Sequence, residues 1–475
     1  MESNVAPSPS ELSRLQRLIL EEERNRAWLV ERIERLKAKL ESLHKQADDS
    51  LLRMRSYRIA TYPARRLPPE IIGEIFLHII VSLQADKTLV NSVPSYLYPF
   101  QVCSAWREVA VNMPQVWTSL SLSLDVGRLH GLDEIISTFW GRARTFPLSL
   151  HLQCDSFGGK CPSLKLQPFV ERIETLCLDV PPSFVEGIFS PYKSELLGLH
   201  RLIMHWSSQT FTPITSFVDA TQLTSFTLYG PSYGCAIGSF NLPWSQLRTL
   251  DLRKGPVGRH VILPILSTCG ELEDLRINLV RSASNTSSAA APVTIPSLRR
   301  LSITGAVSVI PDFLNDLILP SLVELEVINI THTTWYKPLV LSTLQQRSKF
   351  SLSKFRFDGA TTPDDMTALL DNSPFLVELS LKFSTAEVTD TVLSLIASKA
   401  SVYLPALHTL SLSDSQQINA KGDLIEMIHE IIAQRWNGST RIERLRQLQF
   451  LPGHTIRAMQ EQLRDYISEG LHLST

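Results

Sequence analysis

The sequence contains few groupings of residues that could carry out catalysis or hold a metal. The segment Gly158–Cys161 places two glycines before a lysine, but it lacks the earlier glycine and the following hydroxyl residue of a phosphate-binding loop. The motifs His-Glu-x-x-His, Cys-x-x-Cys and Gly-x-Ser-x-Gly are absent. Cys154 and Cys161, with His151, form a weak zinc candidate because no second ligand pair accompanies them. We therefore expect a binding protein with no catalytic residues, no cofactor and no metal.

A second set of candidates consists of charged residues that recur within a repeated Leu-x-x-Leu-x-Leu pattern. If each copy forms a strand with buried leucines, the x positions face a partner. The basic residues at or beside these positions are Arg201, Arg248, Arg276, Arg299, Arg300, Lys354, Arg356 and Arg446. The acidic ones are Glu174, Asp251, Glu273, Asp274, Glu324, Glu326 and Glu378. Eight basic residues against seven acidic ones give no basic stripe, which argues against nucleic acid as a partner.

From this set we select the residues that would contact a protein substrate. They are Arg201, Arg248, Asp251, Arg299, Arg300, Glu324 and Glu326. The alternative is that Arg299 and Arg300 only form charge pairs with Glu324 and Glu326 across neighbouring strands.

The repeated pattern also predicts the fold of the C-terminal part of the chain. Its copies start at Ile173, Leu199, Leu223, Leu247, Leu272, Leu298, Leu322, Leu352, Leu376, Leu407 and Leu445. Most successive copies start 24 to 26 residues apart. This spacing resembles that of leucine-rich repeats, which implies short strands stacked into a solenoid around one continuous core.

The segments around these copies complete the prediction. Alternating apolar residues at 120–124 and 148–152 indicate two further strands. Helices are expected in the return segments 311–319, 363–370, 386–399 and 423–436. The small polar stretch 281–292 is expected to be a loop, with a regulatory phosphorylation cluster as the alternative.

Two shorter apolar helices are expected before the repeats. Pro68 and Pro69 favour a helix start, and Ile72, Ile75 and Phe76 follow at helical spacing. A second helix contains the motif Val102-Cys103-x-x-Trp106-Arg107 and ends before Pro114. From periodicity alone, these are two core helices of a larger domain.

In sequence order, the motifs of residues 63–118 resemble an F-box, the helical module that docks on the Skp-type adaptor of cullin-RING ubiquitin ligases. The spacer Gln84–Leu97 is longer than in a compact F-box. The resemblance implies an adaptor-binding set of Leu67, Pro68, Ile71, Ile72, Ile75, Phe76, Val102, Cys103, Trp106 and Val109.

The N-terminal stretch 11–62 is predicted to be one charged helix, and residues 1–10 are expected to be disordered. Leu29, Ile33, Leu36, Leu40 and Leu43 are separated by four and three residues in turn, which is a heptad seam. One interpretation is a coiled-coil-like helix that forms a homodimer. The other is a helix that packs on its own chain or stands in solvent.

Composition restricts the class of protein and its location. The chain has 475 residues, 44% of them hydrophobic, and a formal net charge of −1, which selects no charged partner such as nucleic acid or an anionic membrane. No apolar run reaches the roughly 20 residues that span a bilayer, and no secretory signal is recognisable. We expect a cytoplasmic or nuclear protein whose six cysteines are free, buried thiols.

Together these observations predict an α/β protein of four segments. They are a disordered terminus (1–10), an N-terminal helix (11–62), an all-α F-box (63–118) and a leucine-rich-repeat solenoid (119–475). The resemblance implies a substrate-recognition subunit of an SCF-type E3 ubiquitin ligase. The alternatives are an interaction scaffold in which the F-box-like helices only cap the repeats, and an enzyme with a site assembled from distant residues.

Overall fold

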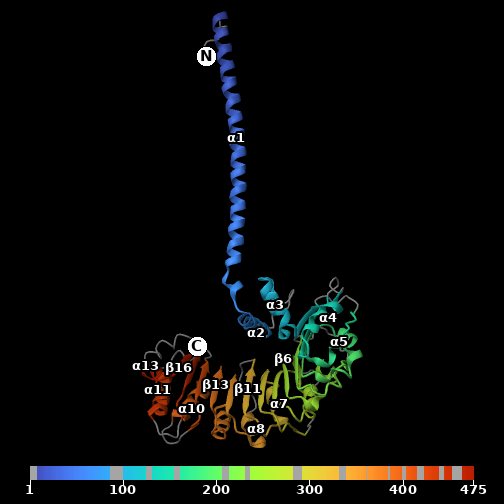
Figure 1. The fold of residues 1–475 in the computed structure, drawn as a ribbon. Coiled ribbons are helices and arrows are strands. Elements are labelled where there is room, and N and C mark those ends of the chain that lie inside the picture. Colours follow the sequence, from blue (N-terminus) through green and yellow to red (C-terminus); the bar gives the residue numbers. More distant parts are fainter. Residues whose placement is uncertain are drawn as a thin grey trace. The chain divides into compact units, whose positions relative to one another are not determined.

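A computed structural model describes most of the chain. The described residues are 8–85, 100–124, 131–154, 161–205, 213–230, 236–281, 291–330, 339–359, 361–382, 386–397, 403–413, 422–437, 443–451 and 463–474. The chain divides into two compact units, one made of Met1–Lys87 and Asn91–Asn112 and the other of Thr88–Val90 and Met113–Thr475. The fold is mixed α/β, with a long N-terminal helix and a large parallel sheet (Figure 1).

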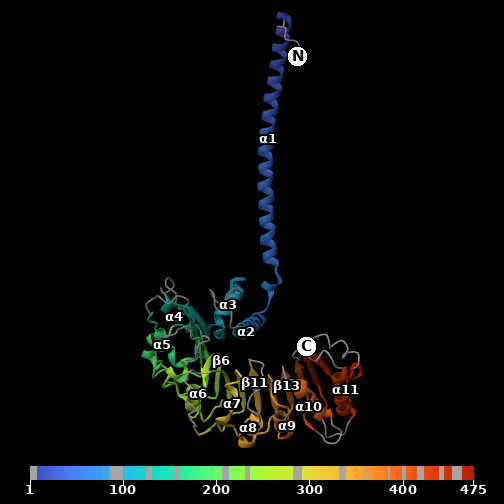
Figure 2. The ribbon, with the colours of Figure 1, turned by 180° about the vertical axis from the view of Figure 1, so that it is seen from behind.

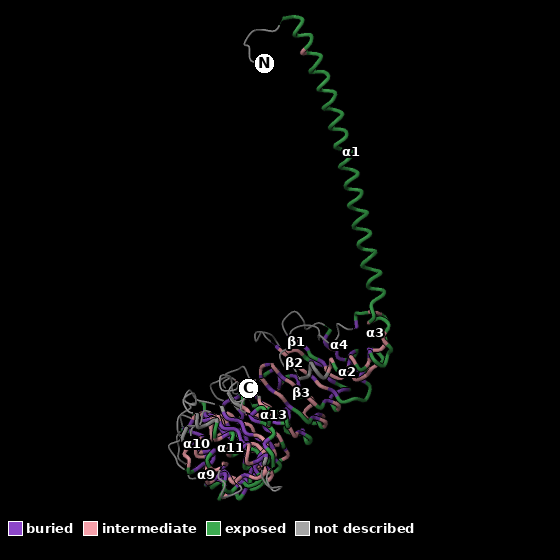
Figure 3. The backbone as a smooth tube through the Cα atoms, turned by 90° about the vertical axis from the view of Figure 1, so that its left-hand side faces the viewer, coloured by how far each residue is buried: buried purple, intermediate pink, exposed green. Residues whose placement is uncertain are grey.

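The first unit begins with α1 (Pro9–Thr61), a continuous helix of 53 residues. Its start is fixed by Ser8, whose hydroxyl accepts from the Glu11 backbone N–H while the Glu11 carboxylate accepts from the Ser8 N–H. None of its residues is buried, and Figure 3 shows the helix as almost entirely exposed. Residues 1–7 of the expected disordered terminus lie outside the described residues, and Pro9 and Ser10 already belong to α1.

The rest of this unit consists of the short 3₁₀ turn η1 (Pro63–Arg66) and the helices α2 (Pro69–Ala85) and α3 (Ser104–Asn112). The Phe76 ring of α2 meets the edges of Phe100 and Trp106, with ring centroids 5.0 and 5.6 Å apart. The Trp106 indole N–H donates to the Ala64 carbonyl at 2.8 Å, which ties α3 to η1. Residues 86–97 of the predicted spacer Gln84–Leu97 lie outside the described residues.

The second unit is organised around a 14-stranded parallel sheet whose strands follow one another in chain order. Its strands are β1 (Ser119–Ser123), β2 (Leu148–Gln153), β3 (Ile173–Asp179), β4 (Arg201–His205), β5 (Ser225–Tyr229), β6 (Thr249–Gly258), β7 (Asp274–Val280), β9 (Arg300–Gly305), β11 (Glu324–Asn329), β12 (Lys354–Asp358), β13 (Glu378–Lys382), β14 (Thr409–Ser413), β15 (Gln447–Leu451) and β16 (His472–Ser474). Each of the eleven predicted copies contains one of these strands, and the first residue of every copy is buried.

Helices and turns connect the strands and lie on one side of the sheet (Figures 1 and 2). The helices are α4 (Leu132–Arg142), α5 (Pro182–Phe189), α6 (Arg259–Leu266), α7 (Ile310–Asn315), α8 (Val340–Ser348), α9 (Pro363–Asp371), α10 (Ala386–Ala397), α11 (Gly422–Asn437) and α13 (Arg464–Ser468). The 3₁₀ turns are η3 (Pro114–Trp117), η4 (Val170–Arg172), η5 (Ser190–Tyr192), η6 (Leu196–Gly198), η7 (Ala236–Ser239) and η8 (Trp244–Gln246).

The predicted helix at 311–319 is too long. It ends at Asn315, and Leu317–Ile318 form the strand β10, which pairs in parallel with β8 (Val293–Thr294) in a separate two-stranded sheet. The cause is a competing set of hydrogen bonds, because the N–H groups of Val293 and Ile295 donate to the carbonyls of Asp316 and Ile318. The predicted polar loop 281–292 falls largely on residues 282–290, which lie outside the described residues.

Buried polar side chains join neighbouring connections on the helical side. The Asp365 carboxylate of α9 accepts from the backbone N–H groups of Leu341 and Ser342 at 3.1 and 2.9 Å, capping the first turn of α8. The Arg435 guanidinium of α11 donates to the carbonyls of Tyr403, Leu404 and Leu407 at 3.0, 2.9 and 3.2 Å. These bonds satisfy backbone groups that no strand or helix pairs.

Candidate functional site

A groove with a volume of about 430 Å³ lies on the face of the sheet opposite the helices. It extends from β6 to β13 and is lined mainly by charged side chains. The lining residues are Arg253, Asp274, Arg276, Arg300, Leu301, Ser302, Glu324, Leu325, Glu326, Lys354, Phe355, Arg356 and Glu378. Five basic and four acidic side chains nearly balance, so the groove offers sites for both signs of charge.

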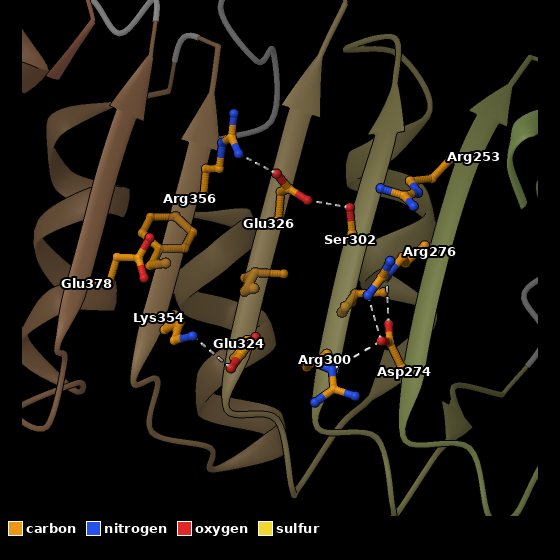
Figure 4. A pocket seen from close by; sticks show the side chains of 13 residues that line it. Arg253, Asp274, Arg276, Arg300, Ser302, Glu324, Glu326, Lys354, Arg356 and Glu378 are labelled. Carbon is orange, nitrogen blue, oxygen red and sulfur yellow. Dashed lines mark hydrogen bonds and ion pairs between the residues drawn. The ribbon is translucent and has the colours of Figure 1, made fainter. Parts of the chain in front are cut away.

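Strand register brings these residues into two rows, as Figure 4 shows. The first row alternates in sign across five neighbouring strands: Asp274, Arg300, Glu324, Lys354 and Glu378. The second row, two residues further along each strand, contains Asp251, Arg276, Ser302, Glu326 and Arg356. Because parallel strands in an unbroken register repeat the same positions side by side, the x positions of successive copies become neighbours.

Asp274 is the centre of one ion-pair cluster in this groove. Its side chain is only 5% exposed, and it accepts two hydrogen bonds from Arg276, at 3.1 and 3.0 Å. The Arg300 Nε donates a third bond at 3.1 Å from the adjacent strand. A buried carboxylate with three charge-assisted bonds holds both guanidinium groups in place, and each of these remains at least a third exposed.

Glu326 is the centre of a second cluster. It accepts a hydrogen bond from the Ser302 hydroxyl at 2.7 Å and pairs with Arg356 at 3.2 Å. Lys354 pairs with Glu324 at 3.4 Å, while Glu378 has no ion-pair partner among the described residues. These pairs are partly exposed, so a bound partner could exchange them for its own charges at little cost.

Asp251 and Arg253 border the groove on β6. The Arg253 guanidinium donates to both Asp251 oxygens, at 3.2 and 2.8 Å. Burial raises the pKa of Asp251, but the hydrogen bonds and charge of Arg253, with the charge of Arg276, outweigh it and lower the pKa overall. The Asp251 side chain therefore remains charged at neutral pH, which keeps both arginines paired.

The structure brings together only part of the predicted substrate-contact set. Arg300, Glu324 and Glu326 line the groove, and Asp251 adjoins it through its pairs with Arg253 and Arg276. Arg248 instead pairs with Glu273 at 3.6 Å, outside the groove, and Arg299 is exposed just before β9. Arg201 is at the start of β4, three strands from β7 in the sheet order.

Among the polar residues of the groove, the selection missed seven: Arg253, Asp274, Arg276, Ser302, Lys354, Arg356 and Glu378. Four of the charged ones had a usable signal, because Arg276, Lys354, Arg356 and Glu378 occupy the same repeat positions as the residues selected. Asp274 also occupies a selected repeat position, but its burial depends on Arg276 and Arg300, which the repeat pattern does not show. Ser302 occupies the same repeat position as Glu326 but is uncharged, and Arg253 follows the last position of its copy.

The predicted adaptor-binding residues divide by exposure. Ile72, Phe76 and Trp106 are buried in the core of the first unit. Leu67, Ile75, Cys103 and Val109 are half-buried, and Pro68, Ile71 and Val102 are exposed. The exposed members form the part of the set that a partner can reach in this conformation.

A second group of side chains lies on β2 to β6 of the sheet. The His205 and Tyr229 rings stack with centroids 4.4 Å apart, and the Lys254 ammonium lies 5.0 Å from the Tyr229 ring centroid. Burial and the nearby charge of His205 lower the pKa of His151, while Asp179 opposes them. This group is aromatic and cationic, in contrast to the paired charges of the groove.

The groove offers little support for catalysis. No histidine or cysteine lines it, and its one hydroxyl, on Ser302, donates to Glu326. In the described part of the chain, no three His, Cys, Asp or Glu side chains are placed to hold a metal ion. The five described cysteines are free thiols, of which only Cys154 and Cys269 are buried; burial raises the pKa of Cys269 to about 11.

Comparisons with known proteins add no family. No protein-family model matches the sequence, and a search of curated proteins found no similar chain. Among the helices that the structure describes, none combines the length and apolar character of a bilayer-crossing segment.

Proposed function

We propose that this chain is the substrate-recognition subunit of an SCF-type E3 ubiquitin ligase. In this proposal, residues 63–118 are an F-box that binds the Skp-type adaptor. The parallel sheet and its connections are a leucine-rich-repeat solenoid that binds a protein substrate. The chain itself transfers no ubiquitin; it holds the substrate near the enzyme that does and so raises its effective concentration.

The observation that carries the adaptor part is the exposure of apolar residues beside the α2–α3 core. Ile71 is 47% exposed and Val102 is 37% exposed, although both belong to the motifs that resemble an F-box. The motif aromatics Phe76 and Trp106 are buried against each other. This division supports a module with its own core and a separate apolar surface for a partner.

The repeat part is supported by the order and spacing of the strands. Eleven leucine-rich copies give strands that pair only with their neighbours in the sheet, in chain order and in parallel. A single copy cannot bury its apolar face alone, so neighbouring copies share one core. Arrays of this kind present a long face of exposed side chains, which suits the binding of proteins.

The groove between β6 and β13 is the proposed substrate site. Its five basic and four acidic side chains favour a protein surface that carries both signs of charge. A nucleic-acid backbone would meet four carboxylates there, which disfavours it. The exposed ion pairs of Glu324 and Glu326 are the groups that such a partner would replace.

The adaptor experiment uses variants of exposed residues, because substitution of Phe76 or Trp106 would disturb the core. The purified chain is tested for complex formation with a Skp-type adaptor, beside Ile71→Glu, Val102→Glu and Val111→Glu. Val111 is a matched control, since it is 40% exposed on the same helical pair but is not in the predicted set. We expect Ile71→Glu and Val102→Glu to weaken binding at least tenfold and Val111→Glu to leave it unchanged.

The same experiment tests the alternative function. If the folded parent chain binds no adaptor, the ligase proposal is wrong and the protein is a repeat scaffold for an unidentified partner. If all three variants bind like the parent, the adaptor contacts another surface and the residue assignment is wrong.

A further inference from the structure

In the described part of the chain, the long helix α1 buries no face against another element. It spans 53 residues, which at the rise of an α-helix is about 80 Å, and none of them is buried. The helix nevertheless carries large apolar side chains, such as Leu29, Ile33, Leu36 and Leu40, that are about half exposed. Isolated helices gain little stability in water, and most helices depend on packing of an apolar face. An exposed stripe of this length points to a partner helix.

The apolar stripe follows a heptad along nearly the whole helix. With Ile33 at position a and Leu36 at position d, residues 12–57 contain 14 a and d positions. Eleven of them are apolar: Leu12, Leu15, Ile19, Leu29, Ile33, Leu36, Leu40, Leu43, Ala47, Met54 and Tyr57. Glu22, Arg26 and Ser50 interrupt the seam. Among the described residues, neither Glu22 nor Arg26 has an ion-pair partner.

From these two charged residues we infer that α1 pairs with α1 of a second copy of this chain in antiparallel orientation, with Glu22 of each copy facing the partner's Arg26. In an antiparallel pair, each a residue meets a d residue of the other helix. The register that joins Glu22 to the partner's Arg26 also sets Ile19 against the partner's Leu29, Leu15 against the partner's Ile33, and Leu12 against the partner's Leu36. Six of the resulting eight core layers are fully apolar, and they use the seam from Leu12 to Leu36; the seam residues from Leu40 to Tyr57 lie beyond the overlap of the two helices.

A parallel pair in register is disfavoured by charge. It would place Glu22 against the partner's Glu22 and Arg26 against the partner's Arg26 in successive core layers. Its flanking positions would bring together Arg32 with Lys37, and Arg53 with Arg58, across the two helices.

The antiparallel register separates these like charges, because Arg32 then faces the partner's Leu18 and Lys37 faces the partner's Pro9. Glu11 meets the partner's Lys39, whereas Glu23, beside the twofold axis, meets the Glu23 of the other copy. Both core charges find opposite partners, which satisfies groups that would otherwise be buried unpaired. The C-terminal ends of the two helices would lie about 110 Å apart. The inference rests on α1 alone and does not depend on the proposed function.

Charge reversal in the full chain tests this register. The mass of the purified protein is measured by light scattering over a range of concentrations, with dimerisation expected to double the 53.4 kDa of one chain. Glu22→Arg alone and Arg26→Glu alone each set like charges together in two layers, so we expect at least tenfold weaker dimerisation. The double variant Glu22→Arg/Arg26→Glu restores opposite charges and should restore the dimer. In a parallel pair all of these proteins carry like-charge layers and would behave alike.

A matched control separates dimerisation from helix stability. Glu31→Arg disrupts the ion pair of Glu31 with Arg35 within one helix but lies outside the seam, so helix content and dimer mass should stay near the parent values. Circular dichroism measures helix content in every variant. A parent chain that is monomeric at all concentrations, single variants that dimerise like the parent, or a double variant that stays monomeric would each overturn the inference.

Discussion

Charged side chains occur on both sides of the parallel sheet, but their partners differ. On the helical side, Arg435 and Asp365 are buried and bond to backbone groups of neighbouring connections. On the strand face, Arg356 and Glu326 are partly exposed and pair with each other. The helical-side charges replace missing backbone hydrogen bonds and therefore stabilise the fold. The strand-face charges can exchange partners without exposing the backbone, which suits recognition.

The largest expected difference between the two sides comes from Arg435. Burial lowers the pKa of Arg435 to about 10, so the guanidinium is still charged at neutral pH, and both of its terminal nitrogens donate to backbone carbonyls. Arg435→Met removes the arginine donor from the carbonyls of Tyr403 and Leu407, while the Leu404 carbonyl keeps its bond from the Leu407 N–H, and we expect a loss of about 3 kcal/mol or more in the free energy of unfolding. Urea unfolding followed by circular dichroism measures it.

Arg444 provides the control for this substitution. It is exposed, and its guanidinium lies 4.9 Å from the ring centroid of Trp436, so Arg444→Met should cost less than about 1 kcal/mol. Equal losses for Arg435→Met and Arg444→Met would show that burial does not distinguish the two kinds of charge.

Two neighbouring acids at the start of α9 give a second, smaller contrast. Asp365 is 1% exposed and caps α8, whereas Asp364 is exposed. Asp365→Ala should lower the free energy of unfolding by about 2–3 kcal/mol, because two backbone N–H groups lose their acceptor. Asp364→Ala removes only a favourable charge near the helix start, which is worth about 0.3–1 kcal/mol. Thermal and urea unfolding of both variants provide the test, and a larger effect at Asp364 would contradict it.

Within the groove, we expect the cost of replacing a charged residue to fall as its exposure rises. Asp274 is on the strand face but is buried, so Asp274→Asn should cost about 1–2 kcal/mol by weakening its bonds to Arg276 and Arg300. Glu324 pairs with Lys354 in a more exposed place, and Glu324→Gln should cost less than about 0.5 kcal/mol. Urea unfolding measures both variants. If Glu324→Gln destabilised the protein more than Asp274→Asn, exposure would not determine how much these charges contribute to stability.

The leucine pattern was sufficient to predict all eleven copies of the strand, because burial imposes its period directly on the residue types. The helical-side contacts could not be predicted in this way. Asp365 caps a helix that lies 24 residues earlier in the chain, and Arg435 reaches carbonyls about 30 residues away. Nothing in the local sequence of either residue reveals such a partner. The end of α7 was also missed, since β8 competes for the same backbone groups.

The groove was partly predictable for the same reason. Arg300 and Glu324 were found because copies in register place equivalent positions side by side. Arg248 and Arg299 were selected in place of Arg276 and Arg356, although their position within the copy falls just before the strand. Residues just before a strand look equivalent in sequence to residues inside it, but only those inside the strand line the groove.

His151 tests an intermediate case on the strand face. It is half-buried on β2, and its pKa lies below the ordinary value of 6.5, because burial and the charge of His205 disfavour the protonated ring more than Asp179 favours it. In the folded state it therefore binds a proton less readily than in the unfolded state. Its contribution to stability is present above pH 6.5 and is lost as the pH falls through 6.5 toward the lower folded pKa. His151→Gln should thus reduce the loss of stability between pH 7.5 and 5.5 in urea unfolding, while His260→Gln, at an exposed position, should leave it unchanged. If His151→Gln kept the pH dependence of the parent, protonation of this half-buried ring would not affect the free energy of unfolding. Partial burial on the strand face would then have no more effect on stability than the exposure of Glu324.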